Sequence, residues 1–271
     1  MQDNNQQEQN QEKKSHLRRL KSFVLRQGRM TVGQQQAYDN LWDDYGIGNK
    51  LSKSYAQTEK AKLPVLDLQT LFTKNQPINL EIGFGMGDSL VEMASTSPDK
   101  NFLGIEVHTP GVGRILQQIE KLQLKNLRVF HADAIEIIEQ QIPADSLAAV
   151  YLFFPDPWHK RRHNKRRIVS QSFIKLIYSR LQKGGIFHLA TDWQDYAKYM
   201  LVQLNEYILK SKTEPTENTS ITINFSNQST TDDYITRPKW RPQTKFERKG
   251  LKKGHGIWDI VFKKEEKNVK I

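Results

Sequence analysis

The chain has 271 residues and a mass of 31.6 kDa, which corresponds to one domain with extensions or at most two domains. It contains no cysteine, which excludes disulfides, thiolate metal sites and every mechanism with a cysteine nucleophile. The longest apolar run, 147–154, has eight residues, whereas a membrane-spanning helix needs about 20. The N-terminus is polar and lacks the pattern of a secretory signal, so we expect a cytoplasmic protein.

The net charge of +11 is concentrated in three basic segments. Residues 13–29 contain seven Lys and Arg and no acid, 158–169 contain six and no acid, and 237–255 contain eight with one Glu. Together these segments carry +20, so the rest of the chain carries −9. We interpret this separation as the footprint of a nucleic-acid partner; the alternative is three unrelated solvated faces.

Composition divides the chain into a leader, an arm, a folded domain and a tail. Residues 1–14 form a Gln/Asn-rich leader that has almost no apolar surface to bury, which predicts disorder. Residues 15–60 form a basic N-terminal arm that either folds against the body or orders only on RNA. The folded domain covers 61–264, and 265–271 are a tail.

Hydrophobic patterning predicts alternating strands and helices from residue 78 onward. The predicted strands are 78–84, 101–107, 127–133, 147–154, 185–192 and 253–262. The predicted helices are 88–95, 113–122, 134–141, 169–181 and 194–209, with a polar loop over 211–230. This alternation predicts an α/β fold with a doubly wound, mostly parallel sheet of the Rossmann-like type, and an antiparallel edge strand near the C-terminus.

The first predicted strand runs into a glycine-rich turn that begins with an acid. Gly83, Gly85 and Gly87 alternate after Glu81, which lets a ligand approach the backbone at the carboxyl edge of the sheet. A dinucleotide fingerprint would place its third glycine at position 88, but that residue is Asp88. An acid before the turn suits a cationic ligand such as S-adenosylmethionine. The alternative is a tight turn that serves packing alone.

The next two predicted strands also end in acids. Glu106 follows Gly83 by 23 residues, where such sheets place an acid that binds both hydroxyls of a ribose. Asp133 ends the third strand and is placed to accept a hydrogen bond from an adenine amino group. Three acids at the ends of three consecutive strands favour a nucleoside cofactor over isolated solvated acids.

The fourth predicted strand ends in a proline-flanked carboxylate. Pro155 and Pro157 fix their own φ and disfavour helix in the residue before each, which should hold Asp156 extended at the cofactor edge. Trp158 either stacks on a base or packs against the next helix. A metal site on His159 and His163 is disfavoured because the neighbouring cations would repel a metal ion. The cations of this run predict phosphate contacts by Arg161, Arg162, Lys165, Arg166 and Arg167.

The third basic segment mixes cations, aromatic rings and prolines over 237–247, which predicts a stiff loop. Glu247 is the only acid within 237–255. It either forms a local ion pair or accepts a hydrogen bond from a base edge.

The chain resembles the bacterial tRNA (guanine-N7)-methyltransferases over about residues 17–262. The matching segments are SFVLRQGRMT (22–31), EIGFGMGDSL (81–90), FLGIEVH (102–108), FFPDPWHKRRHNKRR (153–167), ATDW (190–193) and RPQTKFERKGLKKGHGIWDI (241–260). The resemblance implies an S-adenosylmethionine-dependent methyltransferase domain over 61–264, with 237–255 as its substrate-binding basic segment. It also implies methylation of the variable-loop guanine at tRNA position 46.

The resemblance further implies roles for individual residues. Glu81, Glu106, Asp133 and Asp156 would surround S-adenosylmethionine, and Asp156 is also the catalytic candidate. The residues implied to contact the tRNA substrate are Lys160, Asp192, Thr244, Lys245, Phe246 and Glu247. Besides tRNA, we expect no membrane or metal partner, and a monomer or a homodimer.

The absence of cysteine agrees with chemistry at guanine N7, which presents a lone pair and no proton. Asp156 would either stabilise the cationic methylated ring or hold the N1/N2 edge. Three alternatives compete with this interpretation. An exocyclic-amine methyltransferase would carry two prolines after the acid where this chain has one. An inactive RNA-binding protein would not need the strand-end acids, and a nicotinamide dehydrogenase is disfavoured by Asp88.

Overall fold

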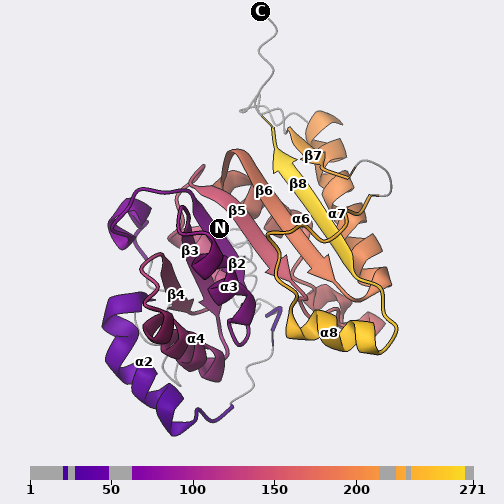
Figure 1. Ribbon diagram of the computed structural model, residues 1–271. Helices are drawn as coiled ribbons and strands as arrows, with labels where there is room; N and C mark the ends of the chain where they lie inside the picture. The colour runs from indigo at the N-terminus through magenta and orange to yellow at the C-terminus, as the bar shows by residue number, and fades with distance from the viewer. Residues whose placement is uncertain (1–20, 24–27, 49–62, 214–223, 230–232, 266–271) are drawn as a thin grey trace, which may run out of the picture.

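The computed structural model describes residues 21–23, 28–48, 63–213, 224–229 and 233–265 (Figure 1). The predicted leader 1–14 therefore lies outside the described residues, as does the tail apart from Glu265. Of the predicted arm 15–60, the described parts are 21–23 and 28–48.

The described residues contain one eight-stranded sheet with the order β1-β4-β3-β2-β5-β6-β8-β7. Every pairing from β1 to β6 is parallel, whereas β8 pairs antiparallel with β6 and β7 antiparallel with β8. The strands are β1 (Gly46–Ile47), β2 (Ile78–Ile82), β3 (Asn101–Glu106), β4 (Leu127–His131), β5 (Leu147–Phe153), β6 (Leu181–Thr191), β7 (Phe225–Asn227) and β8 (Trp258–Lys264).

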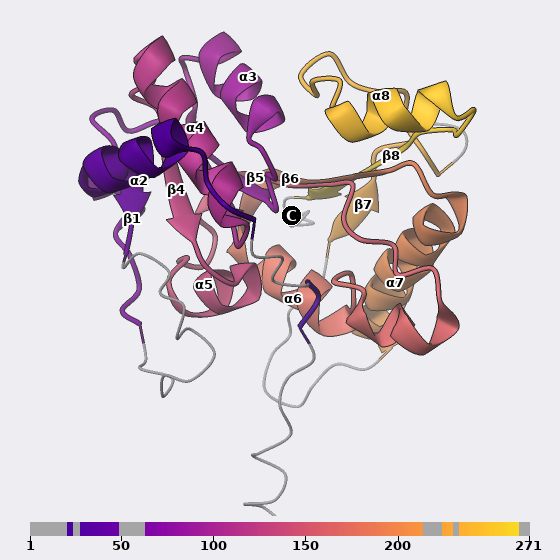
Figure 2. The ribbon, with the colours of Figure 1, turned by 90° about the horizontal axis from the view of Figure 1, so that it is seen from below.

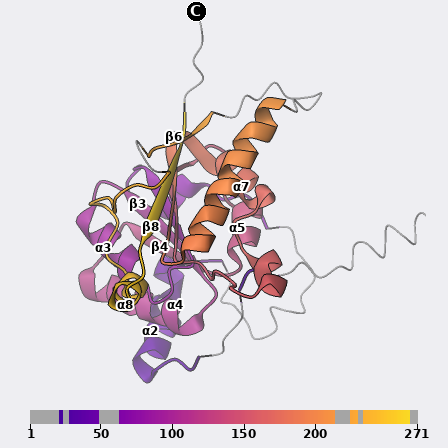
Figure 3. The same cartoon turned by 90° about the vertical axis from the view of Figure 1, so that its right-hand side faces the viewer.

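Helices cover both faces of the sheet, as a doubly wound fold requires (Figure 2). One face carries α2 (Val32–Tyr45), α3 (Asp88–Thr96) and α4 (Thr109–Leu122). The other carries α5 (Ala134–Gln140), α6 (Gln171–Arg180) and α7 (Gln194–Thr213). The short helix α8 (Lys245–Lys252) lies on the same side of the sheet as α3, opposite α7 (Figure 3).

The central strands are apolar because both of their faces are covered. Every residue of β2 and β3 is buried, which is the pattern of a parallel sheet between two helical layers. The side chains form one core beneath α5, α6 and α7 and a second beneath α2, α3 and α4. The predicted fold class, including antiparallel pairing at the C-terminal end of the sheet, is confirmed.

Several predicted element boundaries were wrong. The helix predicted from residue 113 begins at Thr109, because Pro110 occupies its first turn, where a missing N–H costs nothing. The strand predicted over 185–192 begins at Leu181 and passes through Gly184 with φ +75°. The loop predicted over 211–230 contains β7, and this short strand, rather than β8, forms the edge of the sheet.

The described residues contain neither a candidate transmembrane helix nor a candidate metal-binding cluster. No described helix is long and apolar enough to cross a membrane. Among the same residues, no group of three or more His, Cys, Asp or Glu side chains is arranged to hold a metal ion.

Candidate active site

A cleft opens at the carboxyl ends of β2, β3 and β5, and the first turn of α8 borders it. Its volume is about 450 Å³, within the range of small-molecule sites. Ser22 and Phe23 of the N-terminal arm also line it. The predicted site residues that line the cleft are Glu81, Gly83, Gly85, Glu106, Asp133, Asp156, Thr244, Lys245 and Phe246.

The glycine turn after β2 forms an open cradle in the cleft. Gly83 and Gly85 have φ +72° and +59°, in the left-handed region that favours glycine. A Cβ atom built on either residue would meet nothing within 4 Å, so a side chain there would fill cleft space. Gly87, with φ +81°, is the N-cap of α3, and the first two residues of this helix, Asp88 and Ser89, line the cleft.

Glu81 places a partly unsatisfied carboxylate at the base of this turn. Its side chain is 2% exposed; Oε1 accepts a hydrogen bond of 2.7 Å from the Ser89 hydroxyl, and Oε2 has no partner among the described residues. Burial raises the pKa of Glu81 from 4.5 to about 7, against the lowering effect of the Ser89 hydrogen bond. A buried oxygen without a partner that lines a cleft is suited to a cationic ligand group.

Glu106 and Asp133 both accept backbone hydrogen bonds at the ends of their strands. Glu106 Oε2 accepts from Gly85 N–H at 2.7 Å, and Oε1 accepts from the N–H groups of Val107 and His108 at 2.7 and 2.8 Å. Asp133 caps α5 by accepting from Ile135 N–H at 3.0 Å. These bonds fix both carboxylates at the edge of the sheet, where each can still accept further hydrogen bonds.

Asp156 differs from the other strand-end acids because its carboxylate is exposed. It lines the cleft and forms no hydrogen bond or ion pair with any residue that the structure describes. Two residues near it, Phe154 and Trp158, have φ of +50° and +49°. Such conformations persist only where the surroundings impose them. The loop therefore directs one free carboxylate to the edge of the cleft at a defined position.

The basic run after Asp156 divides into outward and inward cations. The 3-10 helix η2 (Arg161–Arg166) exposes Arg161, Arg162 and Lys165 to solvent. Arg166 instead donates to the carbonyl oxygens of Lys21 and Phe23 at 3.2 and 3.0 Å.

Arg167 is also turned into the protein, and Trp158 has a packing role. Arg167 donates to the Pro157 carbonyl at 2.9 Å and lies over the rings of Tyr196 and Tyr199. The Trp158 ring packs beneath the Arg166 guanidinium at 4.1 Å, and its indole N–H donates to Ser22 at 3.3 Å. Of the five cations predicted to contact phosphate, three are exposed, whereas Arg166 and Arg167 make contacts within the protein.

The other predicted substrate residues differ in their position: Thr244 and Phe246 line the cleft, whereas Lys160 and Asp192 do not. Lys160 is exposed at the start of η2. Asp192 follows β6 and lies 3.7 Å from His255 Nδ1. Thr244 caps α8, and its hydroxyl accepts from Glu247 N–H at 3.1 Å. Phe246 is 62% exposed and stacks on Phe154 at 6.5 Å.

Glu247 does not line the cleft. Its side chain is buried and accepts a hydrogen bond of 2.6 Å from Arg241 Nη1, with Arg237 3.6 Å away. The ion pair is one of the two roles that the sequence left open for this residue. Glu247 therefore lies close to its predicted neighbours in the chain, but it fastens α8 rather than facing the cleft.

A buried charge cluster beneath α8 was missed by the sequence analysis. Arg241 is completely buried and donates through Nε and Nη2 to the two carboxylate oxygens of Asp259 on β8, at 2.5 and 2.8 Å. His188 Nε2 on β6 forms a hydrogen bond of 2.7 Å with Oδ1 of the same carboxylate. Burial lowers the pKa of His188. Together with Glu247, this cluster connects α8 and the preceding loop to two strands of the sheet.

No signal in the sequence joins these residues. His188 and Asp259 are 71 positions apart, and only the antiparallel register of β6 and β8 brings them together. In the sequence, Arg241 is indistinguishable from the other cations of the basic segment 237–255. The structure shows that its charge is neutralised inside the protein and is not available to a partner.

The carboxylates that line the cleft fit S-adenosylmethionine. An unpartnered Glu81 oxygen and the free Asp156 carboxylate suit a ligand with positive charge, and Glu106 and Asp133 offer acceptors at the ends of the next two strands. The glycine cradle leaves room for the ligand beside the backbone. Asp88, which a dinucleotide fingerprint would replace by glycine, pairs with Arg114 at 2.6 Å.

The fold and this cleft define a Rossmann-like methyltransferase. Residues 75–260 match the family described as "Putative methyltransferase". The 16S rRNA methyltransferase KamB shares the fold, with a TM-score of 0.50 and 13% identity over 76% of this chain and 97% of its own.

Two curated relatives identify the family. The tRNA (guanine-N(7)-)-methyltransferase of Photorhabdus laumondii is 51% identical over 92% of each chain. That of Idiomarina loihiensis is 47% identical over 92% of this chain and 90% of its own. The chain belongs to the family of bacterial tRNA (guanine-N7)-methyltransferases, which confirms the resemblance and excludes the dehydrogenase alternative.

Proposed function

We propose that this protein transfers a methyl group from S-adenosylmethionine to N7 of a guanine in tRNA, and that the target is the variable-loop guanine at position 46. Family membership supports the reaction, and the position follows from the resemblance alone. The structural observation that supports it best is the free carboxylate of Asp156, at a cleft with acids on its floor and exposed cations beside it.

The floor of the cleft holds the cofactor. S-adenosylmethionine supplies, when bound, an electrophilic methyl group on a positively charged sulfur. Glu81 Oε2 accepts from the cationic amino group of the ligand, which satisfies the buried oxygen. Glu106 receives the ribose hydroxyls, and Asp133 receives the adenine amino group. The cradle of Gly83 and Gly85 lets the ligand contact the backbone closely.

Asp156 acts on the guanine. N7 carries a lone pair and no proton, so the chain needs no general base and contributes chiefly by orientation. The guanine ring becomes cationic as it is methylated. The ordered Asp156 carboxylate either stabilises that charge or accepts hydrogen bonds from the N1/N2 edge, which makes N7 more nucleophilic.

The rim holds the RNA. Lys160, Asp192 and the residues at the start of α8 contact the tRNA substrate, and the exposed Arg161, Arg162 and Lys165 contact its phosphates. Phe246 offers an exposed ring beside the cleft for the displaced base. Drawing the guanine out of folded tRNA costs a few kcal/mol, which these contacts offset.

Mass spectrometry of digested tRNA tests the proposal. After incubation with the protein and S-adenosylmethionine, we expect 7-methylguanosine at position 46. A matched tRNA with 7-deazaguanine at that position retains the N1/N2 edge but lacks N7, so it should remain unmethylated. A methyl group on the exocyclic amine would support the first alternative. Intact tRNA binding without any methylation would support an inactive RNA-binding protein.

A further inference from the structure

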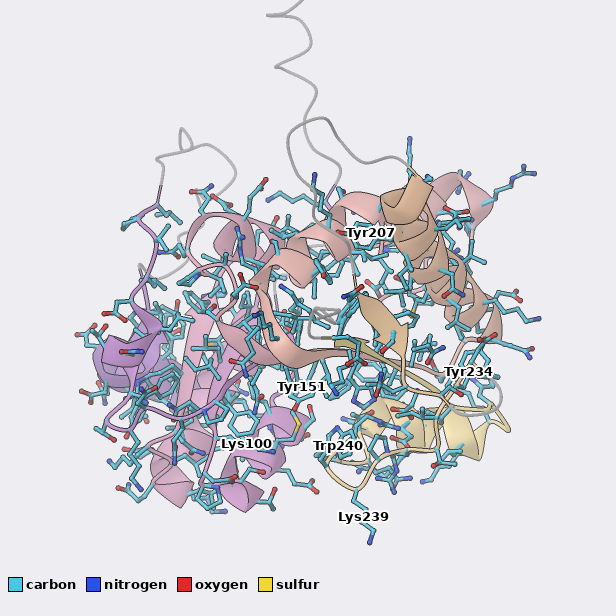
Figure 4. All side chains as sticks on the ribbon, turned by 90° about the horizontal axis from the view of Figure 1, so that it is seen from above. Lys100, Tyr151, Tyr207, Tyr234, Lys239 and Trp240 are labelled. Carbon is cyan, nitrogen blue, oxygen red and sulfur yellow. The ribbon has the colours of Figure 1, made fainter. Side chains whose placement is uncertain are left out.

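Trp240 is an exposed aromatic residue outside the cleft lining. It follows Lys239 in the loop before α8, and its side chain is 50% exposed. In Figure 4, Lys239 projects away from the body of the molecule beside Trp240. A single exposed ring is common on protein surfaces, so exposure alone does not indicate a function. The surroundings of this ring are what distinguish it.

The backbone presents Trp240 at the corner of a closed turn. Arg241 N–H donates to the Pro238 carbonyl at 3.0 Å, so Lys239 and Trp240 are the two central residues of a β-turn. Pro238 and Pro242 bracket this turn and restrict the backbone on both sides. Central positions of such a turn point outward, which places an aromatic ring next to a cation.

The residue that closes the turn is anchored in the core. Arg241 is completely buried and hydrogen-bonded to Asp259 and Glu247. The Trp240 ring meets the buried His188 ring edge-on, with centroids 6.4 Å apart and planes at 78°. Trp240 is therefore held against the body while half of its surface stays in solvent. A ring fixed in this way loses little conformational freedom when a partner covers it.

The charge around Trp240 indicates the class of partner. Lys239 is exposed, Arg237 is partly exposed, and Lys245 and Lys249 line the neighbouring cleft. The only acid of the 237–255 segment, Glu247, is buried in its ion pair and presents no charge to solvent. An exposed ring among cations matches a nucleotide, because the base supplies a flat apolar face and the phosphate a negative charge.

We propose that Trp240 is a stacking platform for an unpaired base of the RNA, at a contact separate from the guanine in the cleft, and that Lys239 binds the phosphate of the same or the adjoining nucleotide. This proposal rests on the proposed function for the identity of the RNA. It adds a second recognition point, which contributes affinity and register rather than chemistry.

Equilibrium binding of transcribed tRNA to the full chain, measured at several salt concentrations, tests the proposal. Trp240→Ala should weaken binding about 5- to 150-fold, the range for loss of one base–aromatic stack. Trp240→Phe should retain most of the affinity, and Trp240→Leu should not, because stacking needs a ring. None of these variants should alter the salt dependence or the affinity for S-adenosylmethionine, which also reports intact folding.

Two controls make the result specific. Lys239→Ala should reduce the slope of log affinity against log salt by about 0.7–0.9, as expected for one phosphate contact. Val202→Ala, at a residue of α7 that is 51% exposed, should leave RNA binding unchanged. Binding by Trp240→Ala within twofold of the original protein, or full affinity with Trp240→Leu, would overturn the proposal.

Methylation is assayed separately, so the two proposals can fail independently. If the unmodified protein binds tRNA but does not methylate N7, the proposed function fails while the Trp240 variants still report on stacking. If N7 is methylated and all Trp240 variants bind equally well, only the stacking proposal fails.

Discussion

The floor of the cleft is acidic and its rim is basic. The charged side chains of the two regions are held in place by different contacts. At the floor, Glu81, Glu106 and Asp133 are positioned by hydrogen bonds from the first turn of a helix or from the backbone of turns at the edge of the sheet. At the rim, η2 and the loop before α8 carry cations, some exposed and some bonded within the protein. The comparison suggests that cofactor binding and RNA binding can be altered separately.

Fewer cations of the rim are available to a partner than the number of basic residues in the sequence indicates. The sequence assigns a net positive charge to each basic segment, but Arg166, Arg167 and Arg241 use their guanidinium groups inside the protein. These three anchor the rim segments, whereas the other cations of 158–169 and 237–255, all of them described, are exposed. Some residues of a basic run can therefore bind a partner, whereas others make internal contacts that hold the run in place.

The largest expected effect is on stability, and it comes from replacing Arg241, which anchors the rim to the sheet. Arg241→Met leaves the buried carboxylates of Asp259 and Glu247 without their partner, so the free energy of unfolding should fall by about 3–5 kcal/mol. Urea denaturation measures this loss. A triple variant that adds Asp259→Asn and Glu247→Gln removes the uncompensated charges and should recover much of the stability. Equal stability of Arg241→Met and the original protein would contradict the role of the cluster.

The next effect tests the chemistry at the boundary between floor and rim. Asp156→Asn keeps the size of the side chain and both flanking prolines, so the fold should persist. Single-turnover methyl transfer at saturating S-adenosylmethionine should fall about 10²- to 10³-fold, the range for one preorganised electrostatic group. Affinity for tRNA should change little, because the exposed cations dominate it.

Asp192→Asn is the matched comparison for Asp156→Asn. It also changes an acid that follows a strand, but Asp192 lies beside His255 and does not line the cleft. This variant should lower transfer mainly through weaker binding of the guanine. A near-normal single-turnover rate for Asp156→Asn would refute its catalytic assignment.

The sequence predicted the floor better than the rim. The acids of the floor end consecutive parallel strands, and the carboxyl ends of such strands meet at one edge whatever the exact register. The sequence alone therefore places Glu81, Glu106, Asp133 and Asp156 together, and all four line the cleft. The fastening of the rim could not be predicted, because it depends on the pairing of β6 with β8 and on Arg166 reaching residues 21–23.

A smaller effect, on cofactor binding, is expected for the buried Glu81 than the effect on methyl transfer expected for the exposed Asp156. Glu81→Ala should weaken S-adenosylmethionine binding by about 1–3 kcal/mol, because a polar group of the ligand then lacks its partner. The raised pKa of Glu81, about 7, adds a pH dependence. Below pH 7 the free protein holds the carboxyl neutral, so affinity for a cationic ligand should decrease as the pH falls. Calorimetric titration between pH 6 and 8 measures this trend, which Glu81→Gln should diminish.

The same shift affects the stability of the unliganded protein. The folded state holds the Glu81 proton up to about pH 7, whereas an unfolded chain releases it near 4.5. The contribution of Glu81 to the free energy of unfolding is therefore fully present below pH 4.5 and is lost as the pH rises to about 7. Denaturation of Glu81→Gln should lack this component. An unchanged pH profile in the variant would show that Glu81 is not the titrating group.

The smallest effect per residue is expected for the exposed cations of the rim. It tests whether these cations bind tRNA while the inward cations stabilise the fold. Changing Arg161, Arg162 and Lys165 together to Ala should reduce the slope of log affinity for tRNA against log salt by about 0.7–0.9 for each phosphate contact that is lost. The paired variant Arg166→Ala with Arg167→Ala removes two charges from the same run, but their guanidinium groups bind backbone carbonyls and lie over aromatic rings. It should therefore leave the slope nearly unchanged and lower the free energy of unfolding instead. The opposite pattern, with the slope moved only by the second variant, would mean that the inward pair contacts the RNA and that these segments rearrange when tRNA binds.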